Sequence, residues 1–232
     1  MSSLIELKNI SKYYIVNKKT VILKKINYKF KKGLIYSLVG PSGSGKSTLL
    51  NLLSLIDKPS SGEIIINNNS TKYNDISQND QLRADKIGII YQQNNLLPDF
   101  NALENVYLAR LAIDNNKNRA ILEATKIIKS LGLLNRINHF PSELSGGELQ
   151  RIAFSRALIN KPEIILADEP TGSLDQSTAK EVFKILYKLK SKNRLIIYAT
   201  HNRLFANMAD CKLEMIDGNI KPSNARKYQK FI

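Results

Sequence analysis

One stretch of the chain combines glycines, a lysine and hydroxyl side chains at the spacing of a phosphate-binding loop. It follows an apolar run that predicts a strand, and a helix is expected after it. The glycines let backbone N–H groups turn toward a phosphate at the positive end of that helix. Lys46 adds a charge for the β- and γ-phosphates, and Ser47 offers a hydroxyl oxygen to Mg²⁺. Nucleotide binding is therefore the first hypothesis. The loop consists of Gly40, Pro41, Ser42, Gly43, Ser44, Gly45, Lys46, Ser47 and Thr48.

Two adjacent carboxylates follow another apolar run. Residues 163–167 predict a buried strand that ends at Asp168 and Glu169. Asp168 can hold Mg²⁺, often through water, while Glu169 accepts a proton from an attacking water molecule. A solvated acidic turn is the alternative, but it does not explain the four apolar residues that direct the pair toward the phosphate loop.

Two more polar side chains stand at the ends of predicted buried strands. Gln92 follows residues 87–91, and His201 follows residues 195–199. Open α/β sheets bind ligands at the carboxyl ends of their strands. Gln92 could therefore reach a metal ion or water beside the γ-phosphate, and His201 could polarise that phosphate or brace Glu169. His139 lies in a polar segment without an evident partner and is interpreted as structural.

A second glycine-containing helix start lies at Leu144-Ser145-Gly146-Gly147-Glu148. Ser145 is a good N-cap, and the two glycines leave N–H groups open to an anion. A plain capped helix needs no double glycine, so a second phosphate contact is the sharper interpretation.

Tyr13 and Tyr14 lie in a polar loop between two predicted strands, residues 4–10 and 21–30. An aromatic ring at such an edge could stack on a nucleotide base, because every base offers a π-face. A partly exposed tyrosine at a strand end is the alternative, and position alone does not decide between them.

The composition is ordinary for a globular protein except for its charge. The chain has 232 residues, 43% hydrophobic and 24% charged, with a net charge of +15. That charge fits an anionic neighbour, either nucleic acid or an acidic leaflet, or equally a coding bias toward Lys, Asn and Ile. The one cysteine, Cys211, allows no internal disulfide. No apolar run reaches membrane-spanning length and no secretory segment is evident, so any membrane role is expected through a partner.

The pattern of elements predicts a mixed α/β core. Strands are expected at residues 4–10, 21–30 and 63–66, and helices at 102–112 and 117–131. The N-terminal strands should form an antiparallel group, and the buried strands a parallel sheet. Residues 67–80 are polar and expected to be exposed.

Taken together, the motifs resemble the ATP-binding cassette family, the ATPase subunits of ABC transporters. The resemblance extends from Leu4 to about Ile220 and depends on order: GPSGSGKST, a glutamine after a strand, LSGGE, ILADEP, SLD and ATH. No other class of P-loop protein carries LSGG before its Asp-Glu pair. The resemblance implies one cassette over residues 1–232, with a RecA-like core at about 1–91 and 161–220. A helical subdomain would cover about 92–160, and a short basic tail 221–232.

The resemblance also implies a role for each motif. The cofactors would be ATP and Mg²⁺, and the activity would be ATP hydrolysis coupled to transport. Two copies would close head to tail over two ATP molecules. The implied roles are adenine stacking for Tyr14, phosphate binding for the loop and Lys46, and Mg²⁺ binding for Ser47, Gln92 and Asp168. Glu169 would be the general base, and His201 would be the γ-phosphate switch. Asp175 would lie at the dimer interface. The signature would contact the partner's ATP, and it consists of Ser145, Gly146, Gly147 and Glu148.

Two positions depart from the family pattern. Glu148 stands where the family more often has glutamine, and Lys32-Gly33-Leu34 lacks the acidic residue common before the loop strand. Neither departure puts ATP hydrolysis in doubt.

A finer resemblance is to the cassettes that serve macrolide exporters and the lipoprotein-releasing system. It is carried by DKPSSG at Asp57, by YQQNNLLPDFNALENV at Tyr91 and by LADEPTGSLD at Leu166. The segment LLPDFNALENV is most similar to the lipoprotein-releasing ATPase. That likeness implies a peripheral position at the cytoplasmic face of the bacterial inner membrane, under two integral membrane subunits of the LolC and LolE kind. Leu96, Leu97 and Phe100 would then receive a membrane subunit's cytoplasmic helix, or else pack the helical subdomain.

Other tasks for the same ATPase remain open. A MacB-type drug or peptide exporter and an FtsE-like regulator of the cell wall are alternatives within transport. A soluble ATPase acting on nucleic acid or ribosomes would suit the charge of +15. Against it, the chain holds one phosphate loop and one LSGG motif, with no room for a long coiled coil between them. A catalytically inactive cassette is disfavoured because Lys46, Asp168, Glu169 and His201 are all present.

Overall fold

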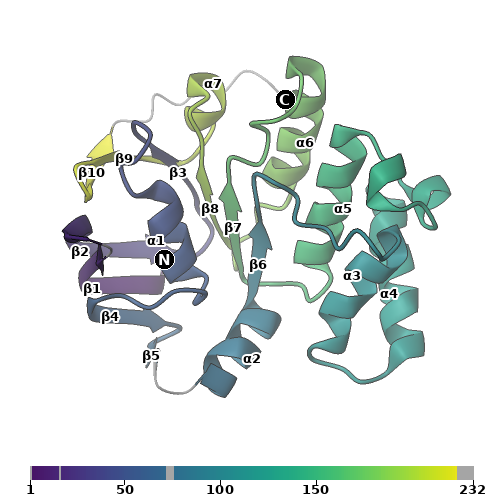
Figure 1. The fold of residues 1–232 in the computed structure, drawn as a ribbon, viewed down its shortest axis with the longest axis horizontal. Helices are drawn as coiled ribbons and strands as arrows, with labels where there is room; N and C mark the ends of the chain where they lie inside the picture. The colour runs from purple at the N-terminus through teal and green to yellow at the C-terminus, as the bar shows by residue number, and fades with distance from the viewer. Residues whose placement is uncertain (1, 16, 72–75, 224–232) are drawn as a thin grey trace. The chain divides into compact units, whose positions relative to one another are not determined.

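A computed structural model describes residues 2–15, 17–71 and 76–223 (Figure 1). The chain divides into two compact units. The first unit comprises residues 1–79 and 190–232, and the second comprises residues 80–189. Helix α2 (Ile76–Lys86) begins in the first unit and ends in the second, and its first residues lie in the stretch 67–80 that the sequence predicts only to be polar and exposed.

The first unit contains an antiparallel sheet in the order β2-β1-β4-β5. The buried residues of β1 are Leu4, Ile5, Leu7, Ile10 and Lys12, and register shifts against β2 interrupt the strict alternation that the sequence predicts. Phe30 on β2 packs edge-on against Tyr36, with 5.1 Å between ring centroids. This contact joins the antiparallel sheet to a second sheet of the same unit. The four strands are β1 (Ser3–Ile15), β2 (Lys19–Lys31), β4 (Ser61–Ile66) and β5 (Asn69–Ser70).

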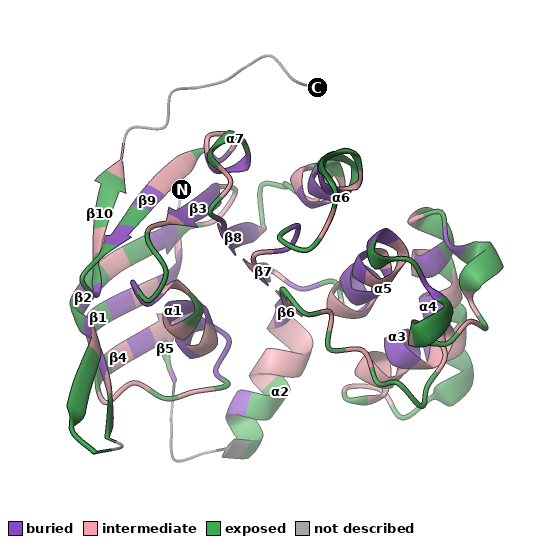
Figure 2. Cartoon of the chain, turned by 45° about the horizontal axis from the view of Figure 1, so that its top comes forward, coloured by how far each residue is buried: buried purple, intermediate pink, exposed green. Residues whose placement is uncertain are grey.

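The second sheet of this unit is mostly parallel. Strand β3 pairs parallel with β8 on one side and with β9 on the other, while β10 pairs antiparallel with β9. Both β3 and β8 are mostly apolar, with the buried Ser37 as the polar exception in β3, and both are deeply buried, as Figure 2 shows in purple. The elements are β3 (Ile35–Val39), α1 (Lys46–Leu53), β8 (Leu195–Ala199), α7 (Arg203–Ala206), β9 (Cys211–Ile216) and β10 (Asn219–Ser223).

Two details of the first unit differ from the sequence-based expectation. Tyr13 and Tyr14 belong to β1 and pair with Val21 and Thr20 of β2, so they lie in a strand rather than in a loop. Lys12 precedes them directly, and the broken alternation of polar and apolar residues hides the end of the strand in the sequence. Residues 221–223, expected to begin the tail, pair with β9, while the rest of the tail lies outside the described residues.

The second unit holds two parallel strands and a group of helices. Strands β6 (Ile87–Ile90) and β7 (Ile164–Asp168) are buried, and α3, α4 and α5 share one apolar core. Gly88 lets β6 approach α5, because an added Cβ would lie 2.4 Å from the Ala157 carbonyl oxygen. The helices are α3 (Ala102–Leu111), α4 (Lys117–Ser130), α5 (Gly146–Leu158) and α6 (Gln176–Lys188), with 3-10 turns at Leu134–Arg136 and Pro141–Glu143.

The core of the second unit gives a stability prediction. Ile128 is fully buried on α4, whereas Leu122 on the same helix is 55% exposed. Replacing Ile128 by alanine leaves a cavity and should lower the free energy of unfolding by about 2–5 kcal/mol. Leu122→Ala should change it by less than about 0.5 kcal/mol. Urea unfolding of the two variants checks this, and equal losses would show that α4 buries a different face.

Candidate active site

The phosphate loop leads into a helix that has no side-chain cap. Helix α1 starts after Gly45, which adopts a left-handed conformation and offers no side chain to the first turn. Helices α3, α5 and α6 all begin differently, because Asn101, Ser145 and Asp175 accept hydrogen bonds from their first N–H groups. The first turn of α1 therefore presents donors that suit an anion.

Two glycines of the loop are required by close approach. A Cβ at Gly40 would lie 2.3 Å from the Met215 carbonyl oxygen, and one at Gly45 would lie 2.8 Å from the Leu23 side chain. Their φ angles, +153° and +100°, also disfavour other residues. The loop is thus held against β2 and β9 in a shape that only glycine permits.

Lys46 and Ser44 supply further donors to this loop. The Lys46 ammonium donates to the carbonyl oxygens of Gly40 and Pro41, at 2.9 and 3.0 Å, so it lies over the loop. The buried Ser44 hydroxyl has no hydrogen-bond partner in the described part of the chain. Ser47 is exposed on the first turn of α1. This donor set fits a phosphate group, and the Ser47 hydroxyl fits a magnesium ligand.

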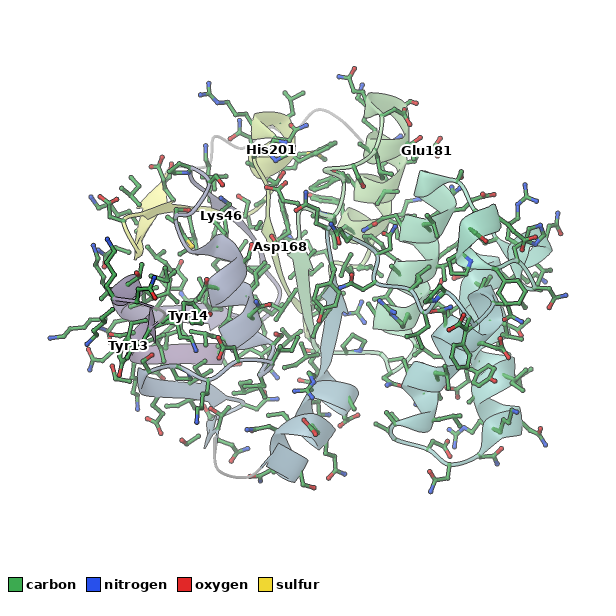
Figure 3. The ribbon with its side chains drawn as sticks, viewed as in Figure 1. Tyr13, Tyr14, Lys46, Asp168, Glu181 and His201 are labelled. Carbon is green, nitrogen blue, oxygen red and sulfur yellow. The ribbon has the colours of Figure 1, made fainter. Side chains whose placement is uncertain are left out.

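His201 shares an edge of the sheet with the start of the loop. Strands β3 and β8 pair in parallel up to Leu38 and Ala199, and the Thr200 N–H donates to the Leu38 carbonyl oxygen at 3.1 Å. Gly40 and His201 thus follow neighbouring strand ends. Figure 3 shows Lys46 at the start of α1 and His201 beside α7.

The second unit brings Gln92 close to Glu169. Strands β6 and β7 pair up to Ile90 and Ala167, so both chains leave the sheet at the same edge. A Cβ added at Gly172 would lie 3.4 Å from Glu169 Cβ and 3.5 Å from Gln92 Nε2. Asp168 is the last residue of β7.

The backbone of Glu169 is strained. Its φ is +44°, a left-handed conformation that costs a residue with a side chain about 1–3 kcal/mol. Such strain is typical of functional sites, where the surrounding structure fixes the conformation. Across the described residues, no three His, Cys, Asp or Glu side chains form a metal-binding group.

The predicted signature forms the start of α5. The Ser145 side chain accepts from the Glu148 N–H, and Glu148 Oε2 accepts from the Ser145 N–H at 2.9 Å, which completes a capping box. Gly147 is buried, and a Cβ there would lie 2.5 Å from Thr178 Cγ2 on α6. Helix packing therefore explains why one of the two glycines is needed. From the sequence, both glycines are expected to open N–H groups to an anion. Ser145 and Gly146 are exposed.

An ion pair that the sequence does not reveal holds Glu148. Arg136 Nε donates to Glu148 Oε1 at 2.8 Å. The hydrogen bond from the Ser145 N–H and the pair with Arg136 lower the pKa of Glu148 to about 2. Arg136 Nη1 also lies 3.3 Å from His139 Nε2, so His139 has a partner.

Asp175 caps helix α6. Its carboxylate accepts from the backbone N–H groups of Ser177 and Thr178, at 2.9 and 3.1 Å. Hydrogen bonds from these two residues hold the pKa of Asp175 well below its usual range. Asp175 is predicted only through the family motif, and its cap of α6 is not evident from the sequence.

Comparison with known proteins identifies the family. Residues 23–172 match the family model described as ABC transporter. The chain belongs to the ABC transporter family. It is 44% identical to the lipoprotein-releasing system ATP-binding protein LolD of Rickettsia bellii, over 96% of this chain and 99% of the relative. The LolD protein of Ehrlichia canis is 46% identical over 94% of this chain and 96% of its own length.

Solved structures agree with this assignment. The dimeric post-hydrolysis structure of the ATP-binding cassette MJ0796 bound to ADP and Pi has a TM-score of 0.89 and 36% identity. It covers 97% of this chain and 100% of its own. The predicted fold, a mixed α/β ATP-binding cassette, is confirmed, whereas the limits of the core and of the helical subdomain remain predictions. No helix among the described residues combines the length and the hydrophobicity needed to cross a membrane.

The Arg136–Glu148 pair gives a pH prediction. The folded-state pKa of Glu148 is below its usual 4.5, so the pair's stabilisation is present above pH 4.5 and is lost as the pH falls toward 2. Glu148→Gln keeps the capping box but not the charge. The melting temperature of the variant should lie slightly below that of the wild type at pH 7, and the gap should close between pH 4.5 and 2. A gap that persists at acid pH would contradict this account.

Proposed function

We propose that this chain is the ATP-hydrolysing subunit of an ABC transporter that releases lipoproteins from the inner membrane. The observation that carries the proposal is the extent of similarity to lipoprotein-releasing ATP-binding proteins, 44–47% identity over 88–96% of the chain. That similarity covers the phosphate loop, the signature and the segment that follows Gln92. ATP hydrolysis follows from membership of the ABC transporter family.

The residues of the site divide the hydrolytic work. The loop N–H groups and Lys46 bind the phosphates and stabilise negative charge as it develops. Ser47, Gln92 and Asp168 hold Mg²⁺, which neutralises phosphate charge when bound. Glu169 takes the proton of the attacking water, and His201 contacts the γ-phosphate. Tyr14 stacks on adenine.

The signature acts on the nucleotide of a second copy. Ser145 and Gly146 are exposed at the positive start of α5, where an anion is stabilised. Gly147 allows α5 to pack against α6, which Asp175 caps. Dimeric cassette structures with high similarity to this chain support two copies acting together.

The segment after Gln92 supplies a surface for the membrane subunits. Leu97 and Phe100 are 46% and 37% exposed, whereas Leu96 packs against the core of α3, α4 and α5. The buried Asn105 side chain accepts from the Leu97 N–H at 2.7 Å and donates to the Phe100 carbonyl oxygen at 2.8 Å. These bonds fix two exposed apolar side chains, which suit the apolar face of a cytoplasmic helix from a LolC- or LolE-like subunit. This contact would hold the chain peripherally at the cytoplasmic face of the inner membrane.

A Glu169→Gln variant tests the hydrolytic mechanism. It should bind ATP normally, hydrolyse it roughly 10²–10⁴-fold more slowly and accumulate as an ATP-bound dimer. Glu181→Gln is the matched control, because Glu181 is an exposed carboxylate on α6 of the same unit (Figure 3). Steady-state ATPase rates and gel filtration with ATP measure both effects. Undiminished turnover in Glu169→Gln would remove Glu169 from the role of base.

The docking surface gives a second prediction. The double variant Leu97→Ser, Phe100→Ser should lose co-purification with the membrane subunits while it keeps its basal ATPase rate. Leu122→Ser is the control, because Leu122 is an aliphatic residue on α4 that is exposed to 55%. Full retention of the membrane subunits by the double variant would show that they bind elsewhere.

A further inference from the structure

A buried lysine lies beneath the tyrosine assigned to adenine. Lys12 on β1 is only 7% exposed, and its ammonium donates to Asp57 Oδ1 at 2.6 Å and to the Lys58 carbonyl oxygen at 2.8 Å. The same ammonium lies 4.8 Å from the centroid of the Tyr14 ring. A buried cation needs such partners, because desolvation of an unpaired charge is costly.

Asp57 joins Tyr14 to this lysine. The Tyr14 hydroxyl donates to Asp57 Oδ2 at 2.9 Å, so the two carboxylate oxygens hold the phenol and the ammonium separately. Burial and the hydrogen bond to Asp57 raise the pKa of Tyr14, and the hydroxyl therefore remains a donor. Tyr14 as a residue is 42% exposed, so its side chain is accessible to a base.

The end of β1 is attached to the phosphate-loop helix through this cluster. Pairing of β1 with β4 ends at Ser11 and Ser61. Beyond that point the Ser60 hydroxyl accepts from the Tyr13 N–H at 3.1 Å. The turn after α1 thus supplies the hydrogen-bond partner that β4 no longer provides to β1. The Asp57 N–H donates to the Asn51 carbonyl oxygen of α1 at 3.2 Å. The Thr48 side chain, in the first turn of α1, lowers the pKa of Tyr14 and partly offsets the effect of Asp57.

We propose that Lys12 and Asp57 are positioning residues that set the Tyr14 ring at a fixed place relative to the phosphate loop. The base and the phosphates of one nucleotide are then recognised together, because the ring and α1 cannot move independently. This inference rests on the proposed function, in which Tyr14 stacks on adenine.

Tyr13 provides an internal comparison. It neighbours Tyr14 on β1, so its side chain points to the opposite face of the strand. Lys19 Nζ lies 4.1 Å from the centroid of its ring. No bond from the Tyr13 hydroxyl to Asp57 is found in the described chain, and Tyr13→Phe is therefore the matched control for Tyr14→Phe.

The test compares two ligands that share phosphates but not a base. ATP and inorganic tripolyphosphate are titrated into the full chain by calorimetry, with Tyr14→Phe, Asp57→Asn and the double variant. Loss of one hydrogen bond should raise the Kd for ATP about two- to tenfold in each single variant and no further in the double variant. The Kd for tripolyphosphate should stay unchanged, as should both values in Tyr13→Phe.

Three outcomes would overturn this inference. Unchanged ATP affinity in Tyr14→Phe would show that the hydroxyl anchor does not place the ring. Equal loss of ATP and tripolyphosphate affinity would show that the cluster only supports α1. If Asp57→Asn does not fold, Tyr14→Phe still decides, because it keeps the ring and the Lys12–Asp57 pair. Wild-type chain that binds neither ligand would instead refute the proposed function.

Discussion

The structure depends on an uncapped helix start. Backbone N–H groups that no side chain takes are open to an anion, and α1 begins after Gly45 with no such cap. The constraint extends outward from there. Gly40 must approach β9, Gly45 must approach β2, and Lys46 lies over the loop carbonyl groups. The sheet edge where β3 and β8 end then adds His201 beside the loop.

At other helix starts in the chain, side chains accept hydrogen bonds from the first N–H groups. Ser145 and Asp175 satisfy the first N–H groups of α5 and α6, and each residue is also expected to act toward a second copy. Each of these two residues is thus a helix cap and is also expected to take part in the function of the dimer. Gly147 also combines a structural and a functional role, since it is required for packing against Thr178 within a motif that is expected to contact a phosphate.

Elements whose formation depends on neighbouring residues in the chain could be predicted from the sequence. Continuous apolar runs predicted β3, β6, β7 and β8, because strands buried on both faces need them. Prediction failed where the signal is not local. At the end of β1, Lys12 and Tyr14 both bind Asp57, which lies far along the chain, so the sequence placed Tyr14 in a loop. Helix α2 is polar and lacks a clear apolar stripe. The roles of Gly147 and Arg136 depend on α6 and on Glu148, contacts that only the folded chain brings together.

The central claim is that this ATPase drives lipoprotein release through membrane subunits. The most direct measurement is isolation of the tagged full chain from gently solubilised native membranes, followed by mass spectrometry of the proteins that co-purify. The account predicts two different integral membrane subunits of the LolC and LolE kind together with lipoproteins. Recovery of a single exporter-like permease, or of ribosomes or nucleic acid, would contradict the assigned task while leaving the ATPase chemistry intact.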